Sequence, residues 1–238
     1  MSTNQSGGGM DEATFRQVMN ILLREYPPKD WATGMEPFEV LVAVIISQNT
    51  TVANERRALE NLRESVGLTP EALAEAPLED LERNLHPAGL YRSKASRLKE
   101  IARRLLREYG GNLGQILELL PEEAREALMA MPGVGPKTAD VVLSMVANLP
   151  ALPVDTHIWR IAKRWEIDQA KGYEDVRRSL ENLVAPKRRR ETHLVLIRFG
   201  RETCTARRPR CPICPVALYC PFYAKVKAGV IQLPLFEP

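Results

Sequence analysis

The sequence of 238 residues lacks an apolar run of 18 or more residues, the length that a membrane-spanning helix needs. Its 14 Gly and 18 Pro residues are too few for a collagen-like or low-complexity chain. The 45% of hydrophobic residues exclude a mainly disordered chain. The first ten residues, MSTNQSGGGM, show no charged-then-apolar secretory pattern. We therefore expect a folded protein with no membrane partner and a disordered tail over residues 1–10.

Signals for β-strands are also scarce. The sequence contains no Asn-Gly or Asp-Gly dipeptide and no sustained alternation of apolar and polar residues. Most segments instead repeat apolar residues with the 3.6-residue period of amphipathic helices. In residues 93–111, for example, Ser93 can cap such a helix and Gly110-Gly111 can end it. The predicted fold class is all-α.

Proline marks the expected start of three further helices, at Pro37, Pro70 and Pro121, because proline fits the first helical turn. The segment that begins at Pro37, PFEVLVAVIIS, is apolar on every side, so we expect it in the middle of the fold. Residues 172–184 and 189–203 are predicted to form two more helices.

Positive charge is concentrated near the C-terminus. Residues 187–238 contain 11 Lys and Arg against 3 Asp and Glu, whereas the net charge of the whole chain is only +3. A basic segment on an otherwise acidic protein indicates either contact with a polyanion, nucleic acid first, or a solvated basic surface.

All four cysteines lie in one short segment with the spacing C-x6-C-x2-C-x5-C. Because no secretory signal is present, a disulfide framework is not expected. Four neighbouring thiols indicate a metal centre instead. Structural zinc sites usually use two separate short knuckles, whereas a single loop better fits an iron–sulfur cluster. The four candidate ligands are Cys204, Cys211, Cys214 and Cys220.

The segment MPGVGPKTADVVL joins two predicted helices through Gly133-Val134-Gly135. Two glycines one residue apart permit a tight turn and leave main-chain N–H groups uncovered at the start of the second helix. Such groups bind anions, so the segment is either a site for a DNA phosphate or a plain helix–helix turn.

Two charged residues are candidates for catalysis. Lys137 lies in the first turn of the second helix, where the helix dipole disfavours a cation by about 0.3–1 kcal/mol. A surface lysine tolerates that cost, but the dipole together with partial burial would also favour a neutral, nucleophilic amine. Asp155 precedes another periodic helix, so we expect it to be an N-cap. A capping carboxylate can still face a cleft and stabilise a cation or relay protons.

Five segments, in order, resemble the endonuclease III family, the iron–sulfur branch of the helix-hairpin-helix DNA glycosylases. They span residues 37–223 and read FEVLVAVIISQNTT, GLYRSKA, MPGVGPKTADVVL, LPVDTHIWRIAKRW and FGRETCTARRPRCPICPVALYC. The resemblance implies two helical lobes with a DNA groove between them. One lobe would be a six-helix barrel with the hairpin, at 32–149. The other would be an iron–sulfur lobe from 11–31 and 150–225, followed by a C-terminal tail at 226–238.

The resemblance implies a bifunctional DNA glycosylase/AP lyase of base excision repair that removes damaged pyrimidines, which we expect to be oxidised. Lys137 would form a Schiff base with the sugar, Asp155 would help to activate it, and β-elimination would cut the strand 3′ to the site. The partner would be double-stranded DNA with a damaged base or an abasic site. We expect a cytoplasmic monomer, associated with the nucleoid if the source is prokaryotic.

The resemblance also implies that the cysteines hold a [4Fe–4S] cluster, which presents a basic loop to phosphate. The flipped nucleotide would leave a gap that Asn49 and Leu90 fill. Asn49 stands where glutamine is commoner and Pro136 where a basic residue is often found, which affects the expected lesion preference. Alternatives are a thymine or uracil mismatch glycosylase of the same fold and a non-catalytic DNA-binding module. The predicted DNA contacts are Gln48, Asn49, Leu90, Gly133, Val134, Gly135, Arg207, Arg208 and Arg210.

Overall fold

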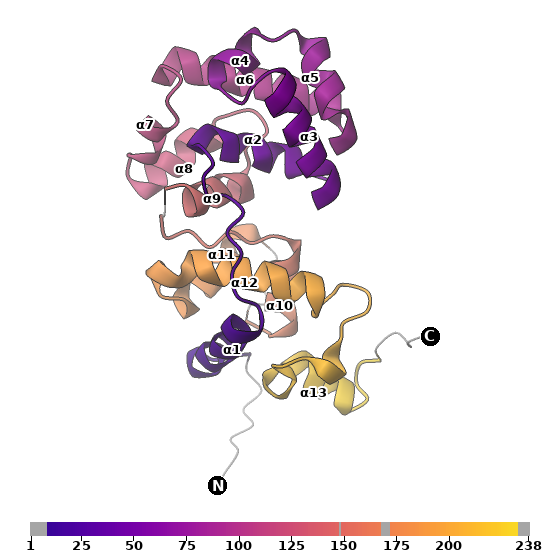
Figure 1. Cartoon of the computed structure of the whole chain (residues 1–238). Helices are drawn as coiled ribbons and strands as arrows, with labels where there is room; N and C mark the ends of the chain where they lie inside the picture. Colours follow the sequence, from indigo (N-terminus) through magenta and orange to yellow (C-terminus); the bar gives the residue numbers. More distant parts are fainter. Residues whose placement is uncertain (1–8, 148, 168–171, 233–238) are drawn as a thin grey trace. The chain divides into compact units, whose positions relative to one another are not determined.

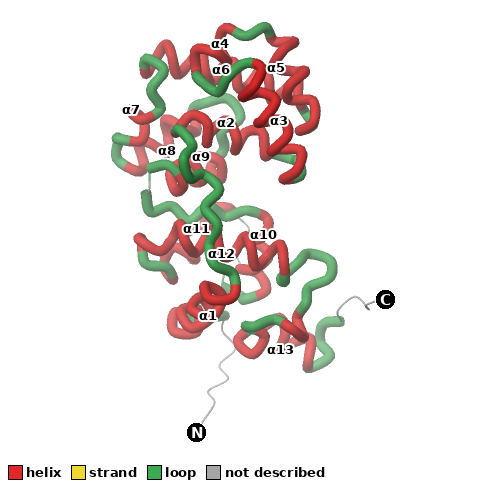
Figure 2. The backbone as a smooth tube through the Cα atoms, in the orientation of Figure 1, coloured by secondary structure: helices red, strands yellow, loops and turns green. Residues whose placement is uncertain are grey.

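A computed structural model describes residues 9–147, 149–167 and 172–232 of the chain (Figure 1). The described residues form helices and loops without a strand (Figure 2), which confirms the predicted all-α class. Ala32–Leu149 forms one compact unit, and the segments before and after it together form a second. In the described part of the chain, no helix combines the length and the apolar character that crossing a bilayer requires.

The unit Ala32–Leu149 is built around α2, which is apolar on all sides as its sequence predicts. Every residue from Val40 to Ile46 is buried, and α2 packs against α3, α6 and α9. The prolines expected to start helices lie in the first turns of α2, α4 and α8. The elements of this unit are α2 (Pro37–Ser47), α3 (Val52–Ser65), α4 (Pro70–Glu75), α5 (Leu78–Leu85), η1 (His86–Ala88), α6 (Tyr91–Tyr109), α7 (Gly114–Leu117), α8 (Pro121–Met129) and α9 (Pro136–Met145).

Helix α6 begins earlier than the sequence predicts. Its N-cap is Leu90, in the left-handed region at φ 50° and ψ 28°, and Ser93 lies within the first turn instead of capping it. The predicted end is confirmed, because Gly110 is the C-cap at φ 56°. The early start follows from the turn at η1, which places the Leu90 carbonyl where the Lys94 N–H donates to it over 3.0 Å.

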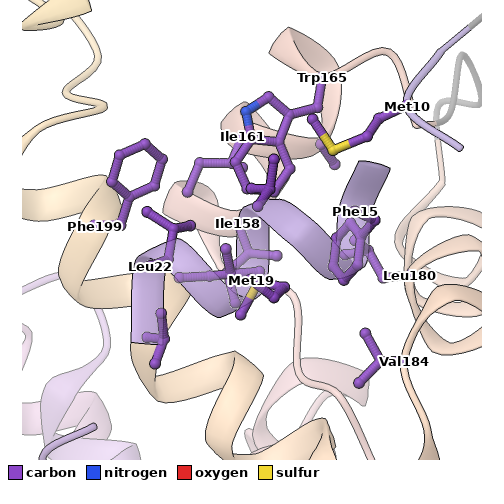
Figure 3. Close-up of a cluster of buried hydrophobic side chains, with 14 of the residues drawn as sticks. Met10, Phe15, Met19, Leu22, Ile158, Ile161, Trp165, Leu180, Val184 and Phe199 are labelled. Atoms are coloured by element: carbon purple, nitrogen blue, oxygen red, sulfur yellow. The ribbon is translucent and has the colours of Figure 1, made fainter. Parts of the chain in front are cut away.

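The second unit is held together by an aromatic core (Figure 3). Phe15 of α1 meets the ring of Trp165 edge-on at 6.0 Å, and Trp165 stacks on Phe199 of α12 at 6.1 Å. Burial of three large rings stabilises the packing of α1, α10 and α12. The elements are α1 (Glu12–Glu25), α10 (Thr156–Arg164), α11 (Tyr173–Leu183), η2 (Pro186–Arg188), α12 (Arg189–Glu202), η3 (Cys211–Ile213), η4 (Ala217–Tyr219) and α13 (Pro221–Lys227).

Both expected tails are longer than the structure allows. Met10 is buried in the aromatic core, and its N–H donates to the carbonyl of Trp165 over 3.1 Å, so it does not belong to a disordered tail. Helix α13 runs through Lys227, so the C-terminal tail does not begin at residue 226. Residues 1–8 and 233–238 of the two predicted tails lie outside the described residues.

Candidate active site and cysteine centre

The hairpin between α8 and α9 presents main-chain groups at the start of α9. Gly133 has φ 78°, a conformation that favours glycine, and both Gly133 and Gly135 are exposed. The Val134 side chain is buried and its N–H donates to the carbonyl of Met131 over 3.2 Å, so the predicted phosphate contact of Val134 has no donor left for it. Gly135 is the N-cap of α9 and provides no side chain to bond the free N–H groups of the first turn. This arrangement suits an anion.

A buried ion pair joins the two helices of the hairpin. Arg125 of α8 donates from Nε to Oδ1 of Asp140 over 2.7 Å and from Nη2 to Oδ2 over 3.3 Å. The Asp140 side chain is 1% exposed. The bidentate geometry sets α8 and α9 in a fixed orientation, and therefore also sets the turn between them. Sequence reasoning missed this pair, because the two residues are separated by the hairpin and Asp140 lies within an apolar run.

Lys137 is half-buried in the first turn of α9, one turn before Asp140. Asp155 belongs to the other unit, where it caps α10, and its Oδ1 accepts from the N–H groups of His157 at 2.9 Å and Ile158 at 2.8 Å. The predicted N-cap is therefore confirmed. Within the part of the chain that the structure describes, Oδ2 of Asp155 accepts no hydrogen bond from a side chain or main chain. That oxygen can serve a reacting group.

The gap-filling candidates share an uncommon backbone conformation. Asn49 has φ 54° and Leu90 φ 50°, and among the described non-glycine residues only Glu166 is also at positive φ. Asn49 is exposed, and the Leu90 side chain is 61% exposed although it is apolar. A leucine in the left-handed region is an outlier, and such strain often occurs at functional sites. The backbone therefore supports a special role for these two positions independently of their residue types.

Gln48 connects the Asn49 segment with the hairpin. Its Nε2 donates to the carbonyl of Gly133 over 3.1 Å and to the Thr138 hydroxyl over 3.3 Å. Gln48 was predicted to contact DNA, but this amide is engaged with the protein. The structure thus favours a role in fixing the hairpin against the end of α2.

Arg97 of α6 lies directly against the hairpin and was missed by the sequence analysis. A Cβ atom on Gly133 would lie 2.6 Å from Cδ and 3.1 Å from Nε of Arg97, so the arginine stem occupies the space that a side chain at Gly133 would need. Arg97 is half-buried, and it forms no ion pair within the described ranges. Pro136, the first residue of α9, provides no cation at this turn, whereas Arg97 places one beside it. Sequence analysis missed Arg97 because only the tertiary fold brings this residue of α6 next to Gly133.

Helix α10 runs from Asp155 to the cysteine loop. Arg160 donates from Nε to the Cys204 carbonyl over 2.9 Å and from Nη2 to the Gly200 carbonyl over 2.8 Å. One turn later, Arg164 donates from Nη1 to the Thr205 carbonyl over 2.8 Å and to Sγ of Cys204 over 3.1 Å. Sequence reasoning missed both arginines, although their spacing of four residues on one helix was a usable signal.

The four cysteines line one small pocket in the second unit, together with Arg164, Trp165 and Phe199. Burial raises the pKa of Cys214 to about 12 and of Cys220 to about 11, and it also raises the pKa of Cys211. Thiols in this setting are neutral at pH 7 unless a cation stabilises the thiolate. Within the described ranges, no three His, Cys, Asp or Glu side chains are grouped to hold one metal ion, although all four cysteines line the same pocket.

This donor set fits an iron–sulfur cluster. All four candidate ligands are sulfur and line one pocket, and the Arg164 guanidinium donates to one of these sulfur atoms, which is a contact that stabilises thiolate ligands. The predicted basic residues of the loop, Arg207, Arg208 and Arg210, are all exposed. They form no ion pair with any described residue, which leaves three guanidinium groups at the surface beside the cysteines.

Comparison with known proteins agrees with this geometry. The HhH-GPD superfamily of base excision DNA repair proteins matches residues 42–186. Endonuclease III of Escherichia coli (strain K12) is 35% identical over 218 residues, which cover 91% of this chain and 99% of the relative. Endonuclease III of Thermotoga maritima is 35% identical over 223 residues, 94% of this chain and 98% of the relative.

Among solved structures, a non-covalent endonuclease III–DNA complex superposes with a TM-score of 0.81 at 31% identity, over 92% of this chain and 99% of the other. A thermostable thymine-DNA glycosylase superposes with a TM-score of 0.78 over 90% of this chain and 98% of its own, but at 22% identity, which shows a common fold alone. The chain therefore belongs to the endonuclease III family of the HhH-GPD superfamily and is a DNA glycosylase/AP lyase of base excision repair.

Proposed function

We propose that this enzyme removes oxidised pyrimidines from double-stranded DNA with Lys137 as the nucleophile. The observation that carries the proposal is the position of Lys137 in the first turn of α9, beside main-chain N–H groups that no side chain caps. The same turn can therefore hold a DNA phosphate and place the amine next to the adjoining sugar. A solved structure of a trapped endonuclease III–DNA covalent intermediate, 31% identical to this chain, supports covalent chemistry in the family.

The first chemical step exchanges one bond at C1′ for another. Nζ of Lys137 attacks C1′ of the extruded nucleotide, the bond between C1′ and the base nitrogen breaks, and the base leaves after protonation. Opening of the sugar ring yields a protonated Schiff base. Loss of a proton from C2′ then expels the 3′ phosphate oxygen and cuts the strand. A carboxylate can take up the proton that the attacking amine loses and pass it to the departing base, and it can later remove the C2′ proton; we assign these transfers to Asp155, whose Oδ2 is available.

Binding of the duplex uses the hairpin and the exposed cations. Gly133 and Gly135 would contact phosphate through their main-chain N–H groups, with the guanidinium of Arg97 beside them. Asn49 and Leu90 would enter the stack where the damaged nucleotide leaves it, the leucine as an apolar wedge. The exposed arginines of the cysteine loop, Arg207, Arg208 and Arg210, would contact the DNA backbone at a position other than the one that the hairpin contacts.

The cysteine loop would be held by a [4Fe–4S] cluster ligated by Cys204, Cys211, Cys214 and Cys220. Such a cluster supplies a covalent cross-link among four points of a loop that contains little regular structure. Arg160 and Arg164 then hold the cross-linked loop on α10, and α12 leads into it through Thr203. We assign the centre a structural role in this reaction.

Borohydride trapping tests the nucleophile. The wild-type enzyme with a duplex that contains one abasic site should give a covalent complex upon reduction, and Lys137→Gln should give none. Lys163→Gln, a change at an α10 lysine outside the hairpin, is the control and should trap like the wild type. Trapping by Lys137→Gln at the wild-type level would overturn the assignment. A wild-type enzyme that binds the duplex without trapping would indicate a non-catalytic DNA-binding module.

A further inference from the structure

Lys94 is a buried lysine for which the proposed chemistry has no use. It lies in the first turn of α6, and its side chain is among the largest that are fully buried, at 1% exposure. Nζ donates to the carbonyl of Ile46 over 2.8 Å and to the carbonyl of Ala88 over 2.9 Å. Burial of an ammonium is costly, so a buried lysine bonded to two main-chain carbonyls needs a reason.

The two carbonyls belong to the two segments that carry the gap-filling candidates. Ile46 stands three residues before Asn49 at the end of α2, and Ala88 stands two residues before Leu90 in the turn after η1. Asn49 and Leu90 are both at positive φ. A strained conformation persists only where its surroundings hold it, and Lys94 is the one side chain that bonds to both segments in the described structure.

We propose that Lys94 is a positioning residue that holds the Asn49 and Leu90 segments at a fixed separation, so that both side chains enter the DNA stack together. The proposal rests on the proposed function, because it assumes that these two side chains fill the gap left by the extruded nucleotide. Extrusion of a nucleotide costs a few kcal/mol of free energy. If Asn49 and Leu90 are already held in place, no conformational entropy is lost in ordering them when they fill the gap. Gln48 extends the same bracing to the hairpin through the carbonyl of Gly133.

The chain provides a matched control on the same helix. Lys99, five residues after Lys94, also donates to two main-chain carbonyls, at Ala74 over 2.8 Å and at Ala76. Those carbonyls lie at the end of α4 and belong to neither segment. Lys99→Met therefore removes the same kind of bracing without touching Asn49 or Leu90.

The experiment compares Lys94→Met with Lys99→Met on two substrates. The first is a duplex with one thymine glycol, which requires extrusion and gap filling. The second is a single-stranded oligonucleotide with one abasic site, which requires neither. We expect Lys94→Met to slow single-turnover base removal from the duplex by about tenfold or more, the effect of losing about 1.4 kcal/mol of transition-state stabilisation, and to leave single-strand cleavage within about twofold. Lys99→Met should change neither rate beyond that range.

A variant that lacks both gap-filling side chains makes the test decisive. In an Asn49→Ala, Leu90→Ala enzyme, Lys94→Met should have no further effect on the duplex, because there is nothing left to position. An equal loss on both substrates, or the same loss in this background as in the wild type, would show a merely structural role and overturn the proposal. If Lys94→Met does not fold by circular dichroism, Lys94→Gln takes its place; its shorter side chain can donate to one carbonyl but does not bridge both, so the same loss on the duplex is expected. A wild-type enzyme that cleaves neither substrate would contradict the proposed function instead.

Discussion

The carboxylate of Asp140 accepts two hydrogen bonds from the guanidinium of Arg125, at 2.7 and 3.3 Å, across the hairpin that precedes Lys137. The pair lies in the interior, with the two side chains 1% and 15% exposed. A buried pair of this kind adds little net stability, but removal of one partner leaves an uncompensated charge. Its clearest effect is to fix α8 and α9 relative to each other, and with them the turn that presents its main chain.

We expect Arg125→Met to lower the free energy of unfolding by about 3–5 kcal/mol, because the buried Asp140 carboxylate then lacks the two hydrogen bonds and the charge of the Arg125 guanidinium. The double variant Arg125→Met, Asp140→Leu should recover most of that loss, because no charge remains buried. Urea denaturation followed by circular dichroism measures both. A single variant as stable as the wild type would show that Asp140 does not depend on Arg125.

Arg97 gives a prediction about the salt dependence of DNA binding. Since its guanidinium lies against Gly133 without a carboxylate partner among the described residues, we expect Arg97→Ala to reduce the slope of log Kd against log salt by about 1. Arg103→Ala, at an exposed position of the same helix, is the control. Fluorescence anisotropy with an abasic-site duplex at several salt concentrations measures the slope.

A cation introduced at Pro136 should restore the salt dependence of DNA binding that Arg97→Ala loses. Pro136→Arg in the Arg97→Ala background adds a guanidinium to the same turn, at the first position of α9. Unchanged salt dependence in Arg97→Ala, or an equal change in the Arg103 control, would remove Arg97 from the phosphate contact.

The cysteine centre predicts a coloured protein. We expect the purified enzyme to absorb broadly in the visible range and to contain roughly four iron atoms per chain. Arg164→Met removes the hydrogen bond to Sγ of Cys204, so the visible absorption of this variant should fade faster in air than that of the wild type. The absorption of Lys163→Met should fade at the wild-type rate. Colourless protein with one tightly bound zinc would contradict the cluster assignment.

His157 makes stability depend on pH in a defined direction. Burial lowers the pKa of His157 below its usual value of 6.5, and its Nδ1 lies 3.1 Å from Nη2 of Arg160, which fits a neutral ring that accepts. The unfolded chain therefore binds a proton more readily than the folded one, so stability should fall as pH drops through 6.5 and level off below the lowered pKa. His157→Asn should flatten that decline between pH 7.5 and 5. Melting temperatures at closely spaced pH values measure it, and parallel curves for the two proteins would contradict the assignment.

The sequence predicts the local features of this fold well. Helices that start at proline, the fully buried α2 and the cap at Asp155 all depend on residues close together in the chain, and the structure confirms them. Leu90 shows where local reasoning fails. No propensity places a leucine in the left-handed region, and the start of α6 depends on the turn held by Lys94.

The remaining features depend on contacts between distant segments. Arg97 against Gly133 and Arg164 on Cys204 join residues that are 36 and 40 positions apart. Periodicity places each arginine on a helix, but it does not say which loop that helix will face. The roles of Lys137 and of the wedge residues remain predictions that the trapping and substrate experiments test.

Helix α10 is a rod of only nine residues, and it carries a capping carboxylate at one end and two loop-holding guanidinium groups along its length. At a rise of about 1.5 Å per residue, the rod spans roughly 13 Å. If the cluster proposed for this loop were lost, Arg160 and Arg164 would hold a loop without its cross-link, and the anchoring of α10, with the Asp155 cap at its start, would weaken.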